Sequence, residues 1–83
     1  MKMSKEDRAL VTETCRTLRR WRTALNKAMC IYKASLPRNV QDALEKEFDG
    51  GILLAMRGPE EAANLTRDEV VEILMKSGVI SYE

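Results

Sequence analysis

Apolar residues recur with helical spacing along the first 36 residues of the chain. Steps of three, four or seven separate Val11, Cys15, Leu18, Leu25, Met29, Tyr32 and Leu36. This spacing places side chains on one face of an α-helix, and Arg22 fills the vacant slot in the stripe. Ser4, followed by the acidic residues Glu6 and Asp7, indicates the start of a helix, and Pro37 indicates its end. The pattern therefore predicts one helix over residues 4–36, roughly 45 Å long.

A helix of that length does not fit inside a small domain. A domain of this size has a diameter of about 30 Å. We therefore expect the helix to kink, to project at one end, or to be covered by a second copy of the chain. The third option predicts a homodimer in which the long helices pair antiparallel, so that the basic end of each copy lies against the acidic part of the other.

Shorter helical segments follow the long one. The next helix begins near Pro37 and ends at Gly50 and Gly51, and its apolar positions are Val40, Ala43, Leu44 and Phe48. Residues 52–56 are too few to classify by period. We favour a short buried helix there, with a strand that pairs with residues 79–82 as the alternative. Residues 59–64 are expected to form one helical turn.

The last helix has the clearest boundaries. Thr66 is the predicted N-cap, Glu69 completes a capping box, and Gly78 is the predicted C-terminal cap. Ion pairs four residues apart are expected at Asp42–Lys46 and Glu72–Lys76. Residues 1–83 are thus predicted to form a single all-α domain. It would be a small bundle of three to four helices with a long amphipathic N-terminal helix.

Charge divides the chain into two halves of opposite sign. Residues 1–38 hold ten Lys/Arg and three Asp/Glu, a balance of +7, and residues 39–83 hold four and ten, a balance of −6. On a helical wheel Arg16, Arg20 and Lys27 stand opposite the apolar stripe, with Arg19 at their flank. This basic ridge would suit nucleic-acid phosphates, an acidic protein surface, or pairing with the acidic half of the same chain.

Three further residues near the ridge allow alternative interpretations. Trp21 is either a core residue or an interface anchor, since Trp and Arg dominate binding hot spots. Arg22 lies within the apolar stripe, where a charge needs an acidic partner. Ile31 lies on the otherwise polar side of a segment that is apolar nearly all round. That segment is either wrapped by the later helices or used as an interface.

The residue types needed for catalysis are missing. The chain has no histidine, so triads that depend on an imidazole base are impossible, and Cys15 and Cys30 cannot form a structural zinc site alone. A calcium loop from Asp49 to Glu60 is rejected because Gly51 and Leu53 occupy ligand positions. We expect no enzyme activity, no metal and no cofactor. Without an apolar run long enough for a signal or membrane span, we expect a cytoplasmic protein with reduced cysteines.

These observations predict a non-catalytic protein–protein interaction module, a small adaptor or inhibitor that docks a larger protein with an acidic surface. Phages or mobile elements encode many small helical proteins of this kind. The alternatives are a small nucleic-acid-binding protein that uses the same helix face, and a structural homodimer. The predicted contact residues are Arg16, Arg19, Arg20, Trp21, Arg22, Lys27 and Ile31.

Overall fold

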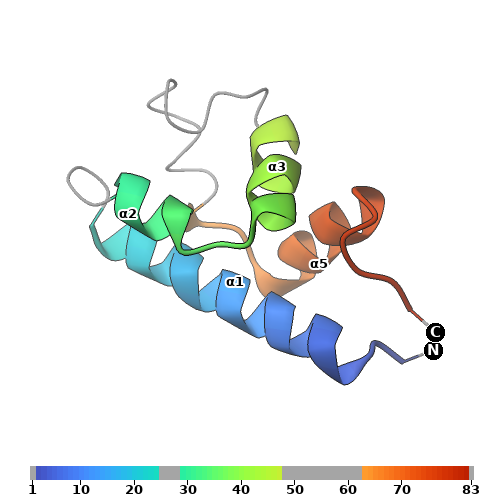
Figure 1. Ribbon diagram of the computed structural model, residues 1–83. Coiled ribbons are helices and arrows are strands. Elements are labelled where there is room, and N and C mark those ends of the chain that lie inside the picture. The colour runs from blue at the N-terminus through green and yellow to red at the C-terminus, as the bar shows by residue number, and fades with distance from the viewer. Residues whose placement is uncertain (1, 25–28, 48–62, 83) are drawn as a thin grey trace.

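The computed structural model describes residues 2–24, 29–47 and 63–82. In these ranges the chain forms four helices (Figure 1): α1 (Lys5–Thr23), α2 (Met29–Ala34), α3 (Arg38–Glu47) and α5 (Arg67–Lys76). The predicted all-α class is confirmed. The predictions for residues 52–56 and for the glycines at 50 and 51 lie outside the described residues.

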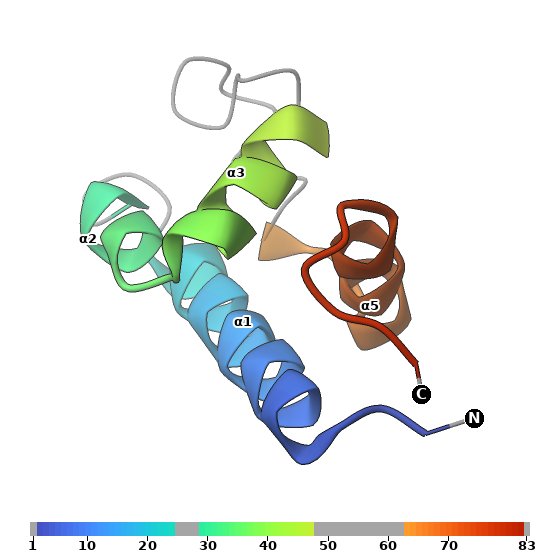
Figure 2. The same cartoon turned by 45° about the vertical axis from the view of Figure 1, so that its right-hand side comes forward.

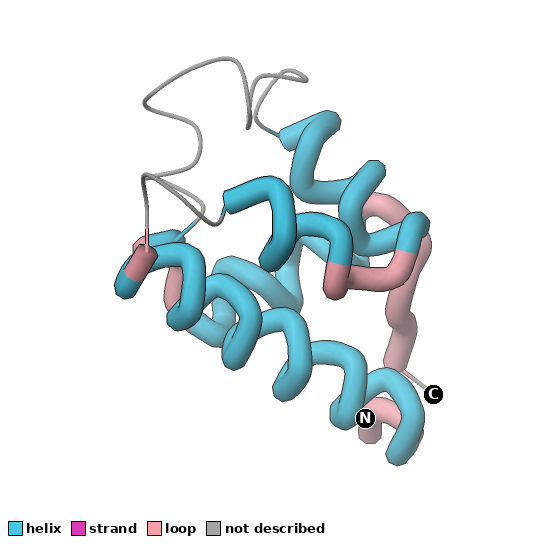
Figure 3. The backbone as a smooth tube through the Cα atoms, turned by 60° about the vertical axis from the view of Figure 1, so that its left-hand side comes forward, coloured by secondary structure: helices cyan, strands magenta, loops and turns pink. Residues whose placement is uncertain are grey.

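The single helix predicted over residues 4–36 is wrong. Helix α1 ends at Thr23, where Ala24 leaves the helical region with φ −130° and ψ 50°. The Ala24 amide still donates to the carbonyl oxygens of Arg20 and Trp21, at 3.0 and 3.2 Å. Helix α2 then packs back against α1, as the tube in Figure 3 also shows. The shortened α1, about 28 Å long, fits the principal extents of 38 × 22 × 20 Å. The length argument for a covering second copy therefore no longer holds.

Helix α1 is the base on which the other helices are arranged. Both α2 and α5 pack against it, and α3 packs against α5 (Figures 1 and 2). The two ends of the described chain lie side by side in Figure 2, where Met3 and Tyr82 form an isolated antiparallel β-bridge. The Ser81 amide also donates to the Asp7 carboxylate, at 3.1 Å. Both ends are thereby held against the start of α1.

The buried stripe of α1 keeps Val11 and Leu18 from the predicted one but passes through positions 14 and 21 instead of 15 and 22. Its buried residues are Val11, Thr14, Thr17, Leu18 and Trp21, whereas Cys15 is only half-buried. Threonine fits this stripe because its methyl group packs while its hydroxyl bonds within the helix. The Thr14 hydroxyl donates to the Leu10 carbonyl at 2.7 Å. The stripe therefore passes through Trp21, and position 22 falls outside it.

The later helices supply the rest of the core, and on α3 the buried positions are those predicted. Val40, Ala43 and Leu44 are buried on α3, and Phe48 lies outside the described residues. Helix α5 buries Val70, Ile73 and Leu74, and half-buried Leu65 packs against the same core. The remaining buried apolar residues lie in the connections, and they are Leu36, Ala63 and Ile80.

The predicted helix caps are confirmed. The Ser4 hydroxyl accepts from the Asp7 amide at 3.1 Å. Thr66 and Glu69 form a complete capping box, with bonds of 3.2 and 3.1 Å. Gly78 takes a φ of 75°, which favours glycine. It turns the chain so that the amide of Ile80 reaches the Leu74 carbonyl, at 3.3 Å, and the Ile80 side chain is buried.

Replacing Thr66 by Ala should lower the free energy of unfolding by about 1 kcal/mol, because the Glu69 amide loses its acceptor. Urea denaturation followed by circular dichroism measures the change. Thr66→Ser retains the hydroxyl and is the matched control, so it should remain within a few tenths of a kcal/mol of the native chain. An equal loss of stability in both variants would show that the Thr66 methyl group, and not the hydrogen bond of its hydroxyl, stabilises the fold.

The ion pairs differ from those predicted. Asp42 pairs with Arg38 at 3.4 Å, rather than with Lys46. Lys33 pairs with Glu45 and so connects α2 to α3. Among the described residues Glu72 and Lys76 form no ion pair, although their spacing would allow one. The Arg38–Asp42 and Glu72–Lys76 positions are exposed, where such pairs contribute little and alternative partners compete.

Candidate functional site

The last two turns of α1 and the facing side of α2 border a hollow of about 290 Å³. Its lining residues are Arg16, Arg19, Arg20, Thr23 and Tyr32. We call it the arginine hollow. The first four residues follow one another at helical spacing on α1, and Tyr32 comes from α2. It contains three of the predicted contact residues and one aromatic residue that was not predicted.

The break after Thr23 creates this hollow. In a continuous helix Tyr32 would lie twelve residues beyond Arg20, about 18 Å along the axis. The return of α2 against α1 brings the half-buried Tyr32 ring beside the arginines instead. The Thr23 hydroxyl donates to the Arg19 carbonyl at 3.1 Å, within the last turn of α1. No local sequence signal marks this break, because neither glycine nor proline occurs between Arg20 and Tyr32.

The arginine side chains are exposed and only weakly engaged by the protein itself. Arg16 pairs with Glu13 one turn earlier on α1. Both side chains are more than half exposed, at 52% and 60%. Such a pair contributes little to stability and can be exchanged for another carboxylate. A guanidinium presents several donors in one plane, which suits bidentate binding of a carboxylate or phosphate.

Cys15 lies on α1 next to Arg16 but has the character of a structural thiol. Burial raises its pKa above the ordinary value of a cysteine, while the positive charges of Arg67 and Arg19 act in the opposite direction. The net shift is upward, so the thiol stays protonated at neutral pH. A protonated thiol is a poor nucleophile and a poor metal ligand. Cys15 therefore adds no chemistry to the hollow.

The other predicted contact residues fall in different places. Trp21 is completely buried in the core, so the interpretation of Trp21 as a surface anchor is wrong and its core interpretation is confirmed. Arg22 is exposed, so its predicted place in the buried stripe is wrong. It forms no ion pair with any described residue, and an acidic partner on another chain stays a prediction. Lys27 lies outside the described residues.

Ile31 is exposed, with 70% of its surface open to solvent. The later helices therefore do not wrap this side of α2, and Ile31 adds apolar area next to Tyr32 in the chain. A second hollow of about 320 Å³ lies towards the start of α1, where Glu6 and Glu13 border Leu10, Leu36 and Pro37. The side of α1 that borders this second hollow thus carries two carboxylates, whereas the last two turns of α1 carry the arginines.

The described residues contain no cluster of His, Cys, Asp or Glu that could hold a metal ion. None of the helices in the described ranges is long and apolar enough to cross a membrane. The chain matches no family model, no curated protein and no solved structure with which it was compared.

Proposed function

We propose that this chain is a non-catalytic protein-binding module whose arginine hollow docks an acidic segment of another protein. The observation that supports it best is the convergence of Arg16, Arg19 and Arg20 with Tyr32 in one hollow. Arg and Tyr are among the residues most enriched in binding hot spots. Exposed Ile31, on the same short helix as Tyr32, offers apolar contact beside the charges.

The charge pattern of α1 favours a protein segment over a nucleic-acid duplex. A duplex carries a phosphate charge about every 1.7 Å along its axis. Beyond Arg16, a backbone that followed α1 would meet a surface of mixed charge, in which the exposed carboxylates of Glu13 and Glu6 alternate with exposed Lys5 and Arg8. An acidic protein segment needs only a few carboxylates within the length of the hollow.

A short nucleic-acid single strand is the second candidate, and Tyr32 is the observation that favours it. Single-strand-binding surfaces combine cations with an aromatic ring on which a base can stack. Tyr32 provides one such ring beside three guanidinium groups. The homodimer remains a separate prediction, which the mass of the protein in solution would test.

Fluorescence anisotropy with labelled probes tests this proposal. The probes are a short peptide in which Glu alternates with Leu, the same peptide with Lys in place of Glu, a DNA single strand and a DNA duplex. We expect the acidic peptide to bind and to retain most of its affinity between about 50 and 200 mM salt. DNA that bound more tightly, with affinity falling by orders of magnitude over that range, would contradict the protein-binding proposal.

A further inference from the structure

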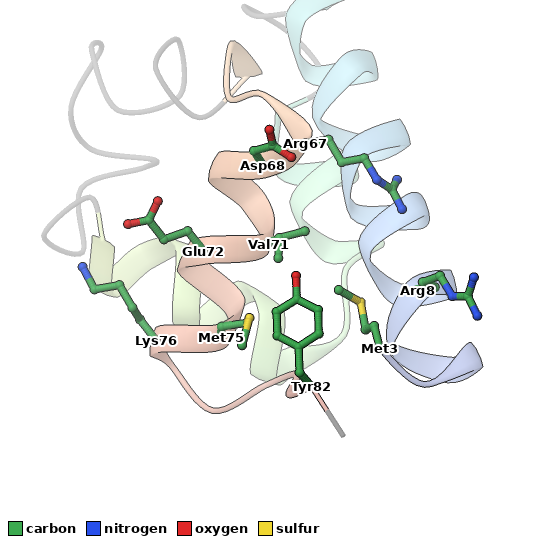
Figure 4. Close-up of a pocket in the computed structure, with 9 residues that line it drawn as sticks. All are labelled: Met3, Arg8, Arg67, Asp68, Val71, Glu72, Met75, Lys76 and Tyr82. Atoms are coloured by element: carbon green, nitrogen blue, oxygen red, sulfur yellow. The ribbon is translucent and has the colours of Figure 1, made fainter. Parts of the chain in front are cut away.

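The two ends of the described chain and helix α5 border a third hollow, which is larger than the other two at about 550 Å³ (Figure 4). We call it the terminal hollow. Its apolar floor is formed by Met3, Val71, Met75 and Tyr82, and it shares no lining residue with the arginine hollow. Its volume falls in the range of pockets that bury a ligand or a partner's side chains.

The chain ends are held in place beside this floor, and its side chains remain partly exposed to solvent. The Met3–Tyr82 bridge joins them, and the Ser81 amide holds the C-terminal segment to Asp7. Tyr82 nevertheless remains 41% exposed. The side chains of Met3, Val71 and Met75 are half-buried. Methionine side chains adapt their shape to an incoming apolar group, and they are common at surfaces that bind helices.

Charged side chains lie on both sides of the floor. In Figure 4, Arg8 and Arg67 lie on the side of α1 and Asp68 lies next to Arg67, whereas Glu72 and Lys76, one of each sign, lie on the opposite side. Arg67 donates only a long bond of 3.4 Å to the Thr12 hydroxyl. Neither Arg8 nor Arg67 forms an ion pair with any described residue. Two guanidinium groups are therefore free to receive carboxylates at one edge of an apolar floor.

The shape of the hollow matches a helix better than a compact ligand. Its lining on α5 extends from Arg67 to Lys76, which is about 13 Å along the helix axis. This length corresponds to two to three turns of a helix lying alongside. Such a helix would place apolar residues spaced three and four apart on the floor.

We propose that the terminal hollow binds an amphipathic helical segment of another protein, with its apolar face on the floor and carboxylates on the flank that meets Arg8 and Arg67. The complementary charge at that edge supports this occupant. A second copy of the chain is a poorer fit, because the apolar faces of α1, α3 and α5 are already buried in their own core. The proposal is independent of the function assigned to the arginine hollow.

NMR of the full chain, with labelled methionine methyl groups, tests this inference. The probe is a designed helical peptide of about 16 residues, with Leu spaced three and four apart and Glu on one flank. A peptide with Lys in place of every Glu is its control. We expect the Glu peptide to shift the methyl signals of Met3 and Met75, while the indole signal of buried Trp21 stays in place. The Lys peptide should bind more weakly.

Charge-reversal variants identify the surface that is used. Arg8→Glu with Arg67→Glu should weaken the Glu peptide about tenfold, which is the sum of two exposed ion pairs. Arg38→Glu with Lys46→Glu reverses two exposed cations that line neither hollow, changes the net charge equally, and should leave this binding unchanged. Tyr82→Ala should also weaken it, by removing part of the floor.

Three results would overturn the inference. The first is unchanged Met3 and Met75 signals at peptide concentrations up to about 1 mM, which corresponds to only about 4 kcal/mol of binding. The second is an equal loss in the Arg38 and Lys46 variant, which would show that net charge, not the terminal hollow, governs the binding. The third is a shift of the same signals with protein concentration alone, which would make a second copy the occupant. Failure here would leave the anisotropy test of the arginine hollow unaffected.

Discussion

Replacing Trp21 by Ala should remove a large part of the free energy of unfolding. Trp21 is the largest fully buried side chain among the described residues, and it lies on α1 in the stripe that faces the other helices. Truncating a buried Trp to Ala costs about 3–5 kcal/mol, through lost burial and the cavity left behind. A domain has only about 5–15 kcal/mol in total, and small domains are marginal.

Circular dichroism during urea denaturation measures this loss, and Arg22→Ala is the matched control. Arg22 is the next residue on α1 but is exposed, so its truncation should change stability by no more than about 0.5 kcal/mol. A Trp21→Ala chain that stayed folded at native stability but lost partner binding would restore Trp21 as a surface anchor. It would also contradict its complete burial.

The elements that the sequence predicted well depend on residues close together in the chain. The Thr66 and Glu69 capping box, the Gly78 turn and the buried face of α3 are all local patterns. Their partners lie within a few residues, so the short-range chemistry of hydroxyls, carboxylates and glycine is enough to predict them.

The break in the N-terminal helix could not be read from local chemistry. Apolar spacing continues through residues 25–36 without glycine or proline, yet α1 ends at Thr23. The packing of α2 against α1 is a tertiary effect, and it outweighs helix propensity. The one available clue was physical: a helix of about 45 Å is longer than a domain of this size is wide.

The candidate site could be predicted only in part, again because tertiary packing is not visible in the local sequence. The exposed arginines follow from the periodicity of α1 alone. Tyr32 joins them only through the return of α2. Of the two interpretations of Trp21, the core holds, because the buried stripe runs through Thr14 and Trp21. Counting threonine as polar hid this course of the stripe and assigned the buried positions to Cys15 and Arg22 instead.

The two proposed surfaces bear on the choice between adaptor and inhibitor. The arginine hollow is cationic with an aromatic edge, whereas the terminal hollow has an apolar floor and charges of both signs. Because they share no lining residue, one chain could hold two partners at the same time. Simultaneous binding would favour an adaptor, and use of one hollow alone would favour an inhibitor.

Reversing the charge of Arg16, Arg19 and Arg20 together should weaken binding of the acidic peptide by about 100-fold, or about 2.7 kcal/mol. Each exposed ion pair contributes up to about 1 kcal/mol, and each Glu adds repulsion. Anisotropy with the Glu–Leu peptide measures the change. The control variant reverses Lys2, Arg38 and Lys46, three exposed cations away from the hollow. It should bind almost as tightly as the native chain.

Carboxylates near the C-terminal end of α1 oppose the helix dipole, so the reversed chain could lose stability as well as binding. Replacing the same arginines by Gln avoids this problem and should still weaken the peptide about tenfold, through loss of the ion pairs. Replacement by Lys separates charge from geometry, because Lys lacks the planar fork that binds carboxylates bidentately and stacks on aromatic rings. Full affinity with Lys would mean that charge alone attracts the partner. Full affinity with Gln, in a folded chain, would remove the arginine hollow as the binding surface.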